Sequence, residues 1–383
     1  MKPIDQPRVY LDHAATSWPK PDAVWDAMTT YAKSCGAAAG RGSYRSAQNA
    51  SGIVESVRQK IARMISAQSN SISFHANGTA ALNAAIHGLV KPGSHVVTTA
   101  ADHNSVLRPL SHLQKHHSVT VTTVSCDSDG HVSIDSIRDA IESETSLVAI
   151  THASNVTGAV QPIAKVGALL KDHPALLLCD AAQTFGCLPI NVSDLGVDLL
   201  AAPGHKGGLG PLGTAFLYAN ANAQDRLEPT IQGGTGGQSE SLEMPEGYPA
   251  KMEAGNLNVP AIAGWAAGLD DLISGDPGPT RMDFAARIHE ELSPLPKVRL
   301  FGKPSPTGTV SLSVEGLSVI DLATILDVEF NIEVRSGLHC AAMIHDFLGS
   351  APEGTLRIST GRTTTHDEIG QVCDAIMAIV SEL

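Results

Sequence analysis

The feature of the sequence that most constrains the fold is a repeated alternation of short apolar runs and longer amphipathic stretches between residues 71 and 218. The apolar runs are rich in β-branched residues and are typical of buried strands; they span 71–75, 95–99, 119–125, 147–152, 176–181, 198–204 and 213–218. Helix-like segments such as 81–90 and 163–173 lie between several of them. The pattern predicts an α/β fold with a mostly parallel sheet and helices on both faces, because parallel strands need crossover connections.

The order of elements changes after about residue 260. A helical segment is followed by an apolar strand at 309–314, a helix near 319–327, an extended stretch at 331–335 and a final amphipathic helix at 369–383. At 383 residues, the chain also exceeds the size at which a single core usually stops growing. We therefore expect a large domain of residues 15–260 and a smaller α+β domain made of residues 1–14 and 261–383.

Charge, hydropathy and cysteine content exclude several classes of function. The net charge of −13 disfavours binding to nucleic acid, and no apolar run is long enough to span a membrane. The N-terminal segment lacks the apolar core of a signal peptide, so we expect a cytoplasmic protein. The six cysteines show no CxxC spacing, and His112 and His116 have no visible third ligand, so neither a disulfide framework nor a metal site is predicted.

Polar residues at the ends of the predicted strands are candidates for a ligand site, because open α/β sheets bind ligands at the carboxyl ends of their strands. Asp180 ends the strand at 176–181, where a buried carboxylate needs a cationic partner such as a pyridinium nitrogen. A helix N-cap is an equally ordinary role for such an aspartate. Lys206 follows another strand within the glycine-rich segment GHKGGLG, where its amine can approach a carbonyl cofactor closely and form a Schiff base.

Three further strand ends carry polar residues. Gly78 and Thr79 open a predicted helix directly after a strand, a geometry that offers N–H groups to a phosphate but is also typical of simple capping. His103 in DHNS and Asn155 in SNVTG follow two other strands, and each alone is an ordinary polar loop residue. Together with the aspartate and the lysine, they predict a phosphate cradle, an imidazole, an amide, a carboxylate and an amine at successive strand ends.

Nine short motifs occur in one order along the chain: YLDHAAT, FHANGTAALN, DHNS, SNVTG, DAAQ, GHKG, GGTGG, EAGNLN and RSGLHCA. This ordered set resembles the cysteine desulfurases of the class V aminotransferase superfamily, which are enzymes that use pyridoxal 5'-phosphate (PLP). The resemblance covers nearly the whole chain and implies a PLP-dependent transferase fold of the aspartate aminotransferase type. It also implies that L-cysteine is converted to L-alanine and that the sulfur passes, as an enzyme-bound persulfide, to an acceptor protein, as in iron–sulfur cluster assembly.

For the cofactor, the resemblance makes Lys206 its covalent attachment site, Asp180 the partner of the pyridinium nitrogen and His103 the imidazole that stacks on the ring. The other cofactor-binding residues that it implies are Asn155 and Gln183 near the phenolic oxygen, Gly78, Thr79 and His205 at the phosphate, and Thr235 and Asn256 from a neighbouring subunit. The last two residues imply a homodimer. Thr235 lies in the segment IQGGTGGQSESLE, which is long enough to be a functional loop.

For the substrate, the resemblance makes Arg357 the residue that binds the carboxylate of L-cysteine, a task suited to the planar fork of a guanidinium. A surface salt bridge is the ordinary alternative, which the apolar neighbours of Arg357 in GTLRISTG disfavour. Further substrate contacts are expected from His13, Asn155 and Arg335.

The reaction itself is assigned by the resemblance to Lys206, His103 and Cys340. Lys206 removes the α-proton, and Cys340 attacks the γ-sulfur as a thiolate, which is a soft nucleophile. We expect the neighbouring His339 and Arg335 to lower the pKa of the Cys340 thiol or to orient it. The form RxGxHCA further resembles the subgroup in which this cysteine sits on a short and rather rigid segment.

Four positions depart from the family pattern. Pro203 stands where Ser or Thr is common, Asn256 where Thr is usual, Tyr44 where a histidine often follows the RG dipeptide, and Ala342 where Pro or Gln is frequent. Pro203 has no hydroxyl to offer a cofactor phosphate.

Three other functions stay open at this point. They are a selenocysteine lyase, another class V aminotransferase, epimerase or lyase in which Cys340 is a bystander, and an inactive subunit of the same fold that serves as a scaffold. Kinetics on cysteine and selenocysteine, a sulfide assay and an absorbance spectrum distinguish them.

Overall fold

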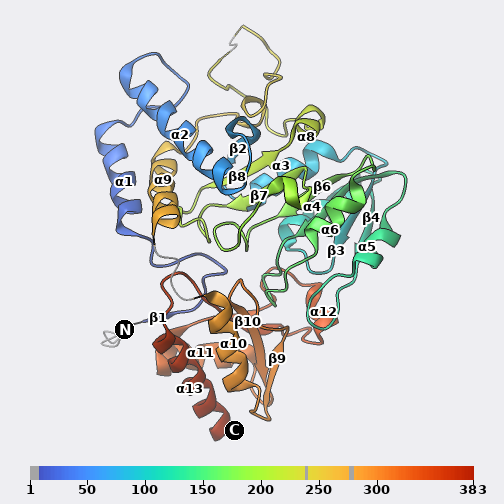
Figure 1. Ribbon diagram of the computed structural model, residues 1–383, viewed down its shortest axis with the longest axis vertical. Helices are drawn as coiled ribbons and strands as arrows, with labels where there is room; N and C mark the ends of the chain where they lie inside the picture. Colours follow the sequence, from blue (N-terminus) through green and yellow to red (C-terminus); the bar gives the residue numbers. More distant parts are fainter. Residues whose placement is uncertain (1–7, 238–239, 276–279) are drawn as a thin grey trace.

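The computed structural model describes residues 8–237, 240–275 and 280–383. A large sheet with its helices lies above a smaller sheet in the view of Figure 1, and the chain crosses between them more than once. The seven strands of the large sheet are β2 (Ile72–His75), β3 (His95–Thr99), β4 (Thr120–Val124), β5 (Thr145–Thr151), β6 (Leu176–Asp180), β7 (Leu199–Pro203) and β8 (Ala215–Ala219). Each lies within or next to one of the apolar runs that predicted strands.

The large sheet has the strand order β2-β8-β7-β6-β5-β3-β4. Strands β7, β6, β5, β3 and β4 pair in parallel, whereas β8 runs antiparallel to both of its neighbours. Strand β8 follows β7 through a loop without a helix, which permits the antiparallel return. The prediction of an α/β fold with a mostly parallel sheet is confirmed.

Consecutive residues of the central strands point to opposite faces of the large sheet, and both faces are buried. In β6, Leu177 and Cys179 belong to one apolar core, while Leu176 and Leu178 belong to a second core on the other face. An uninterrupted apolar run is what a strand covered on both sides requires.

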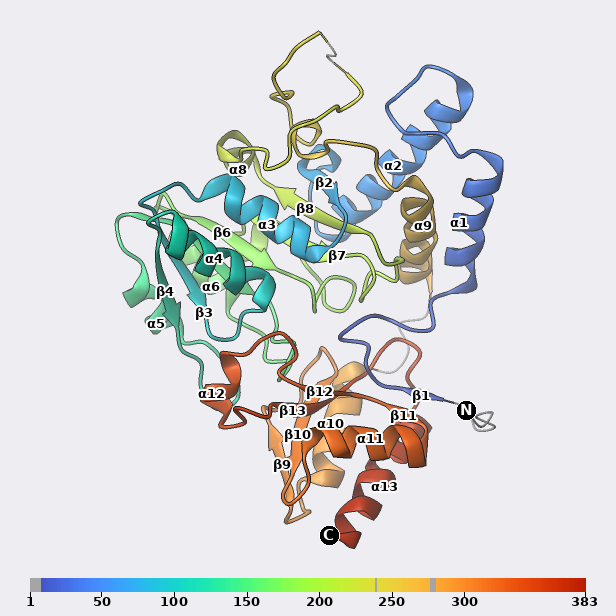
Figure 2. The ribbon, with the colours of Figure 1, turned by 180° about the vertical axis from the view of Figure 1, so that it is seen from behind.

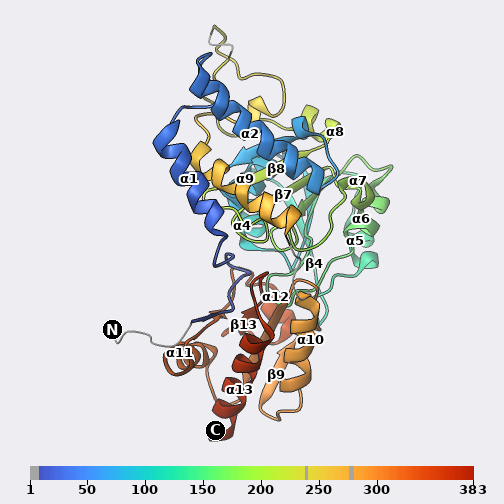
Figure 3. The ribbon, with the colours of Figure 1, turned by 60° about the vertical axis from the view of Figure 1, so that its left-hand side comes forward.

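Helices cover both faces of the large sheet. They are α1 (Asp22–Ser34), α2 (Arg45–Met64), α3 (Gly78–Leu89), α4 (Asn104–His116), α5 (Ile134–Ala140), α6 (Ile163–Leu170), α7 (Val192–Leu195), α8 (Ala221–Arg226) and α9 (Val259–Ser274). Helices α3 and α4 pack on one face, as Figure 2 shows, and α2, α6 and α9 pack on the other. Helix α1 lies alongside α9 in an outer layer (Figure 3). No helix in the described part of the chain is long and apolar enough to cross a membrane.

The smaller sheet is antiparallel and has the order β12-β13-β10-β9. Its strands are β9 (Val298–Phe301), β10 (Thr309–Val314), β12 (Arg335–Gly337) and β13 (Thr355–Ser359), and the helices around it are α10 (Arg281–Leu292), α11 (Val319–Phe330), α12 (Ile344–Leu348) and α13 (His366–Glu382). The N-terminal strand β1 (Val9–Tyr10) joins this part of the molecule through parallel pairing with β11 (Ile332–Glu333). The domain limits stay a prediction; α9, which begins near residue 260, packs against α1 and α2 beside the large sheet.

Candidate active site

The carboxyl ends of β5, β6 and β7 open onto a cavity of about 180 Å³. Eight of the predicted site residues line this cavity: Gly78, Thr79, His103, Asn155, Asp180, Gln183, His205 and Lys206. Their positions span 129 residues of sequence, from 78 to 206, and the topology of the sheet brings them together. Thr235, Asn256, His13, Arg335, Arg357 and Cys340 are not among the lining residues and are described separately below.

Asp180, which is buried, and Lys206, which is half-buried, are the charged groups among the residues that line the cavity. Burial lowers the pKa of Lys206 to about 8, against the opposing effect of the Asp180 carboxylate. Burial raises the pKa of Asp180, while a hydrogen bond from the Ala182 backbone N–H at 2.9 Å and the charge of Lys206 act to lower it. An amine with a lowered pKa is available as a nucleophile near neutral pH, as covalent attachment of a carbonyl cofactor requires.

The glycines beside Lys206 allow the turn after β7 to pack tightly against the large sheet. A Cβ atom at Gly207 would lie 2.3 Å from the carbonyl oxygen of Phe185, and one at Gly204 would lie 2.3 Å from Oγ1 of Thr214. Neither position accepts a side chain without moving the turn. The glycines therefore fix where the backbone presents Lys206 to the cavity.

His103 is neutral and is held in one tautomer. Its Nδ1 accepts a hydrogen bond from the Ser105 backbone N–H at 3.0 Å, so the ring hydrogen lies on Nε2. Burial, followed by the charge of Lys206, lowers the pKa of His103 to about 4. The Ser105 hydroxyl lies 2.9 Å from the same Nδ1 and 2.8 Å from Oγ1 of Thr79, so the imidazole is linked to the start of α3. Sequence reasoning quoted Ser105 but gave it no role.

Asp102 is a second residue that sequence reasoning passed over. It is fully buried, and it accepts hydrogen bonds from Thr98 Oγ1, from the backbone N–H and hydroxyl of Thr99, and from the backbone N–H of Thr151. Burial raises the pKa of Asp102 to about 6, although these hydrogen bonds act in the opposite direction. The carboxylate joins the ends of β3 and β5 and so positions the backbone on which His103 stands. The only signal for it in the sequence is an aspartate one residue before that histidine.

The start of α3 and the nearby His205 form an anion site within the cavity. Helix α3 begins at Gly78, and the side chain of Asn77 caps it by accepting from the Ala80 N–H at 2.8 Å. The free N–H groups of this first turn face the cavity together with His205, whose buried Nδ1 has no hydrogen-bond partner within the described structure. A phosphate group suits this set of donors. Pro203 packs against the same turn, where it supplies contact but no hydroxyl.

A Gly78→Ala variant is expected to bind a phosphate-bearing cofactor about tenfold more weakly, the equivalent of about 1.4 kcal/mol. The added Cβ would lie 3.2 Å from Cδ of Pro203, so the first turn of α3 must shift away from the anion site. Fluorescence titration of the apoprotein with PLP measures the effect. Gly52→Ala is the matched control, because a Cβ at this helical glycine meets nothing within 4 Å. Equal affinity for PLP in the two variants would contradict the assignment of the anion site at the start of α3.

Cys340 lies beside the cavity on a tight and well-anchored turn after β12. Its side chain is exposed, and Nη2 of Arg335 lies 3.7 Å from its Sγ. Both His339 and Cys340 adopt left-handed backbone conformations, with φ of 49° and 57°, which are uncommon for residues other than glycine. The Cys340 carbonyl accepts from the Asn104 N–H at 2.7 Å, and the His339 carbonyl accepts from Nδ2 of Asn155 at 2.7 Å. The anchors come from the same loops that build the cavity.

His339 does not act on Cys340 as a cation. Its ring is buried, and its Nε2 lies 3.0 Å from both the carbonyl oxygen and the hydroxyl of Thr355. Burial, together with the charge of Arg357, lowers the pKa of His339 to about 2. A neutral ring that is bonded to β13 brings no positive charge to the thiolate, so of the two roles expected of His339 only the orientation of the turn at Cys340 stays a prediction. Arg335 is the cationic group that contacts Sγ.

Arg357 is buried at the edge of the site, where it is bonded to Asp12 and to the Asn155 carbonyl. The surface salt bridge considered from the sequence is therefore replaced by a buried one. His13 lies on the other side of Lys206, where it lines a separate water-sized cavity together with Gln183. Its ring packs against Gly361, and it does not reach the cavity that holds Asp180.

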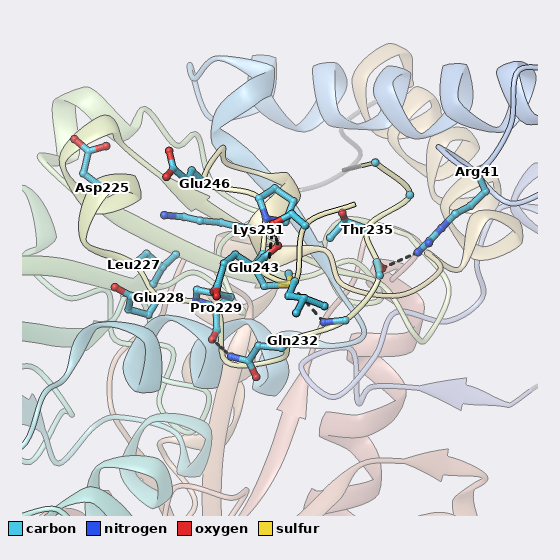
Figure 4. A pocket seen from close by; sticks show the side chains of 18 residues that line it. Arg41, Asp225, Leu227, Glu228, Pro229, Gln232, Thr235, Glu243, Glu246 and Lys251 are labelled. Carbon is cyan, nitrogen blue, oxygen red and sulfur yellow. Dashed lines mark hydrogen bonds between the residues drawn. The ribbon is translucent and has the colours of Figure 1, made fainter. Parts of the chain in front are cut away.

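Thr235 and Asn256 lie away from the cavity of their own chain, on two loops that meet near Arg41. The Arg41 guanidinium donates to the carbonyls of Gly234 and Gly255, at 2.8 and 3.0 Å. Figure 4 shows Thr235 on the same side as Arg41 of a hollow of about 880 Å³, which is lined largely by residues within 225–237 and 241–251. Both loops are exposed in the single chain.

Fold and site together define a PLP-dependent enzyme of the large α/β class. A half-buried lysine and a buried aspartate at neighbouring strand ends, a neutral histidine and an anion site at a helix N-terminus match the aldehyde, pyridine nitrogen, ring and phosphate of PLP. The residues present therefore fit this cofactor.

Comparison with known proteins identifies the family. The family model for aminotransferase class-V matches residues 9–372. A probable cysteine desulfurase of Methanothermobacter thermautotrophicus is 37% identical over 378 residues, which cover 96% of this chain and 93% of the relative. A cysteine desulfurase of Haloferax volcanii is 29% identical over 387 residues, or 97% and 89% of the two chains.

A solved structure supports the same assignment. The apo structure of a cysteine desulfurase from Thermococcus onnurineus has a TM-score of 0.91 and 31% identity, and the match covers 98% of this chain and 95% of that chain. The chain belongs to the aminotransferase class-V family, among its cysteine desulfurases. The predicted family, the enzyme class and PLP as cofactor are confirmed.

Proposed function

We propose that this enzyme desulfurates L-cysteine with Lys206 as the cofactor-binding base and Cys340 as the sulfur acceptor. One observation carries the proposal: the turn that carries the exposed cysteine is anchored by Asn104 and Asn155, next to a cavity lined by a half-buried lysine and a buried aspartate. The same loops thus hold both Cys340, the proposed nucleophile that attacks sulfur, and the cavity for a cofactor that reacts with amino acids.

PLP, when bound, supplies an electron sink that stabilises negative charge on the α-carbon of an amino acid. Asp180 would keep the pyridine nitrogen protonated, and His103, with its hydrogen on Nε2, would cover the ring. Gln183 and Asn155 would supply amide donors to the phenolic oxygen, while the turn at Gly78 and Thr79 and the ring of His205 would hold the phosphate. Lys206 moves the α-proton, a role that its lowered pKa supports.

Arg357 binds the substrate carboxylate. Its side chain is 1% exposed, and its Nε–H is buried without a hydrogen-bond partner among the described residues. A carboxylate is the acceptor that this orphaned donor fits. Arg335 lies opposite Arg357 in the sheet and contributes positive charge to the same place. His13, which was also predicted to contact substrate, lines a different cavity, so no substrate contact is proposed for it.

Sulfur transfer requires no external oxidant. The Cys340 thiolate attacks the γ-sulfur of the substrate, so an S–S bond forms while the bond from sulfur to the β-carbon breaks. The electron pair of the broken bond stays on carbon and is protonated to give the methyl group of L-alanine. Sulfur is oxidised and carbon is reduced by the same two electrons, which leaves a persulfide on Cys340.

Assay of both products tests the reaction. L-cysteine at one equivalent per active site, which leaves no excess substrate thiol, should give alanine without sulfide, and sulfide should appear only when a reducing thiol is then added. Sulfide released together with alanine before that thiol is added would remove the persulfide from the mechanism. Selenocysteine assayed beside cysteine under the same conditions ranks the two substrates.

We infer further that the enzyme works as a cytoplasmic homodimer that passes its sulfur to an acceptor protein, as in iron–sulfur cluster assembly. Support for the dimer comes from the loops of Thr235 and Asn256, which are exposed in one chain and do not reach its own cavity. The loop that carries Thr235 is long and has no helix or strand among its described residues, and loops of this kind usually have a function.

Thr235→Ala is expected to lower PLP retention while the dimer persists, because the hydroxyl would contact cofactor phosphate across the interface. Equilibrium dialysis of the holoenzyme measures retention, and sedimentation measures the assembly. Ser241→Ala, farther along the same loop, is the control. A fully active, PLP-loaded monomer would contradict the shared site.

A further inference from the structure

Asp12 is the acidic partner of the arginine assigned to substrate. Oδ1 of Asp12 accepts a hydrogen bond from Nη2 of Arg357 at 2.5 Å, and the Asn155 carbonyl accepts from Nη1 at 3.0 Å. Two of the three guanidinium nitrogens are therefore held by the protein itself. The third, Nε, is the buried donor without a partner.

The backbone around Asp12 is fixed against the end of β13. The Ser359 N–H donates to the Leu11 carbonyl at 2.7 Å, and the Ala14 N–H donates to the Ser359 hydroxyl at 2.9 Å. The Tyr10 hydroxyl donates to the carbonyl of Asp12 itself at 3.2 Å. Because its backbone is bonded on both sides, Asp12 presents its carboxylate at a constant place relative to Arg357.

The charges of this corner are unbalanced by one anion. Arg335 lies directly opposite Arg357 in the β12–β13 ladder, an arrangement that is unfavourable for like charges. Among the described residues, Asp12 is the acidic side chain that is ion-paired with Arg357. Two guanidinium groups thus lie at this place with one carboxylate, which is paired with Arg357, and the carboxylate of an amino-acid substrate would be the second anion.

We propose that Asp12 is a positioning residue for substrate binding. It holds Nη2 of Arg357 so that Nε–H faces the incoming carboxylate, and it offsets the charge of the buried arginine while the site is empty. The proposal rests on the assignment of Arg357 to the substrate carboxylate. It predicts that Asp12 affects ligands that carry a carboxylate and leaves other amines unaffected.

The test compares two ligands in the PLP-loaded enzyme. L-alanine carries the carboxylate, whereas cysteamine has the amine and thiol of cysteine but no carboxylate. The change in cofactor absorbance on titration measures the affinity for each. Asp12→Ala should weaken L-alanine binding and raise KM for L-cysteine by about tenfold, with kcat and cysteamine affinity close to wild type. Asp12→Asn should show a smaller effect, because its amide oxygen still accepts from Nη2.

Two reference variants distinguish a failure of the Arg357 assignment from a failure of the role proposed for Asp12. Asp129→Ala removes a surface partner of Lys303 and should match wild type in both titrations. Arg357→Lys should weaken L-alanine binding; if it does not, the assignment of Arg357 itself is wrong. If Arg357→Lys weakens binding and both Asp12 variants do not, the role of Asp12 alone is refuted. Loss of cysteamine affinity or of PLP in Asp12→Asn equally overturns it, since that would show a general structural role.

Discussion

Lys206→Ala is expected to abolish covalent attachment of PLP and to lower cysteine desulfuration by about 10⁴-fold, the upper end of what a positioned acid–base group contributes. The lysine is half-buried, lines the same cavity as Asp180 and has a pKa lowered to about 8, so an exposed lysine elsewhere on the surface cannot replace it. Borohydride reduction of the holoenzyme followed by peptide mapping should place the cofactor on the peptide with Lys206. Visible absorbance should be lost or shifted in the variant.

The matched control for this variant is Lys303→Ala, which removes an exposed lysine that is paired with Asp129. It should keep the absorbance band and the rate. The Lys206 variant should remain folded, because the alanine removes an amine that has no hydrogen-bond partner among the described residues and leaves the glycine-rich turn intact. A reduced cofactor found on a different lysine would refute the assignment.

Cys340→Ala is expected to lower sulfide production from L-cysteine by about 10³-fold or more, since a nucleophile is removed and not merely a binding contact. The variant should still bind PLP and still change its absorbance when L-cysteine is added, because Lys206, Asp180 and Arg357 remain. Brief reaction of the wild type with L-cysteine should add one sulfur to the peptide with Cys340, as mass spectrometry detects.

Cys187→Ala is the control cysteine. Cys187 lines the small cavity behind Lys206, on the side of His13, and takes no part in the proposed transfer. It should desulfurate cysteine like the wild type. A Cys340→Ala variant that desulfurates at the wild-type rate would exclude the mechanism, and retained turnover of selenocysteine alone would identify a selenocysteine lyase.

Much of the large sheet could be predicted because strands buried on both faces must be apolar at every position. The segment 176–181 shows this directly, since its successive leucines supply two different cores. The antiparallel direction of β8 is not visible in its own residues. It follows from the loop between β7 and β8, which is too short for a crossover helix and carries Lys206.

The site could be predicted in part for the same reason. Residues that follow parallel strands, such as Asp180 and His103, lie at the same edge of the sheet, because all parallel strands have their carboxyl ends there. The pairing of Asp12 with Arg357 joins residues 345 positions apart, and no local pattern encodes it. His339 shows the opposite case, because sequence neighbours need not face each other: the left-handed backbone at His339 and Cys340 places one side chain in the interior and the other at the surface.

The anchored turn at Cys340 also has a consequence for the proposed sulfur transfer: the acceptor must move toward Cys340. The His339 carbonyl accepts from Asn155 and the Cys340 carbonyl accepts from Asn104, so the backbone that carries the sulfur has little freedom to move outward. In the proposed transfer, the thiol of an acceptor molecule must therefore approach Cys340, because the turn that carries Cys340 does not move toward the acceptor. Leu338, Met343 and Phe347, which lie within seven residues of Cys340 in the sequence, are 38%, 38% and 42% exposed. In the proposed transfer, access to the sulfur would therefore depend on the shape of the recipient.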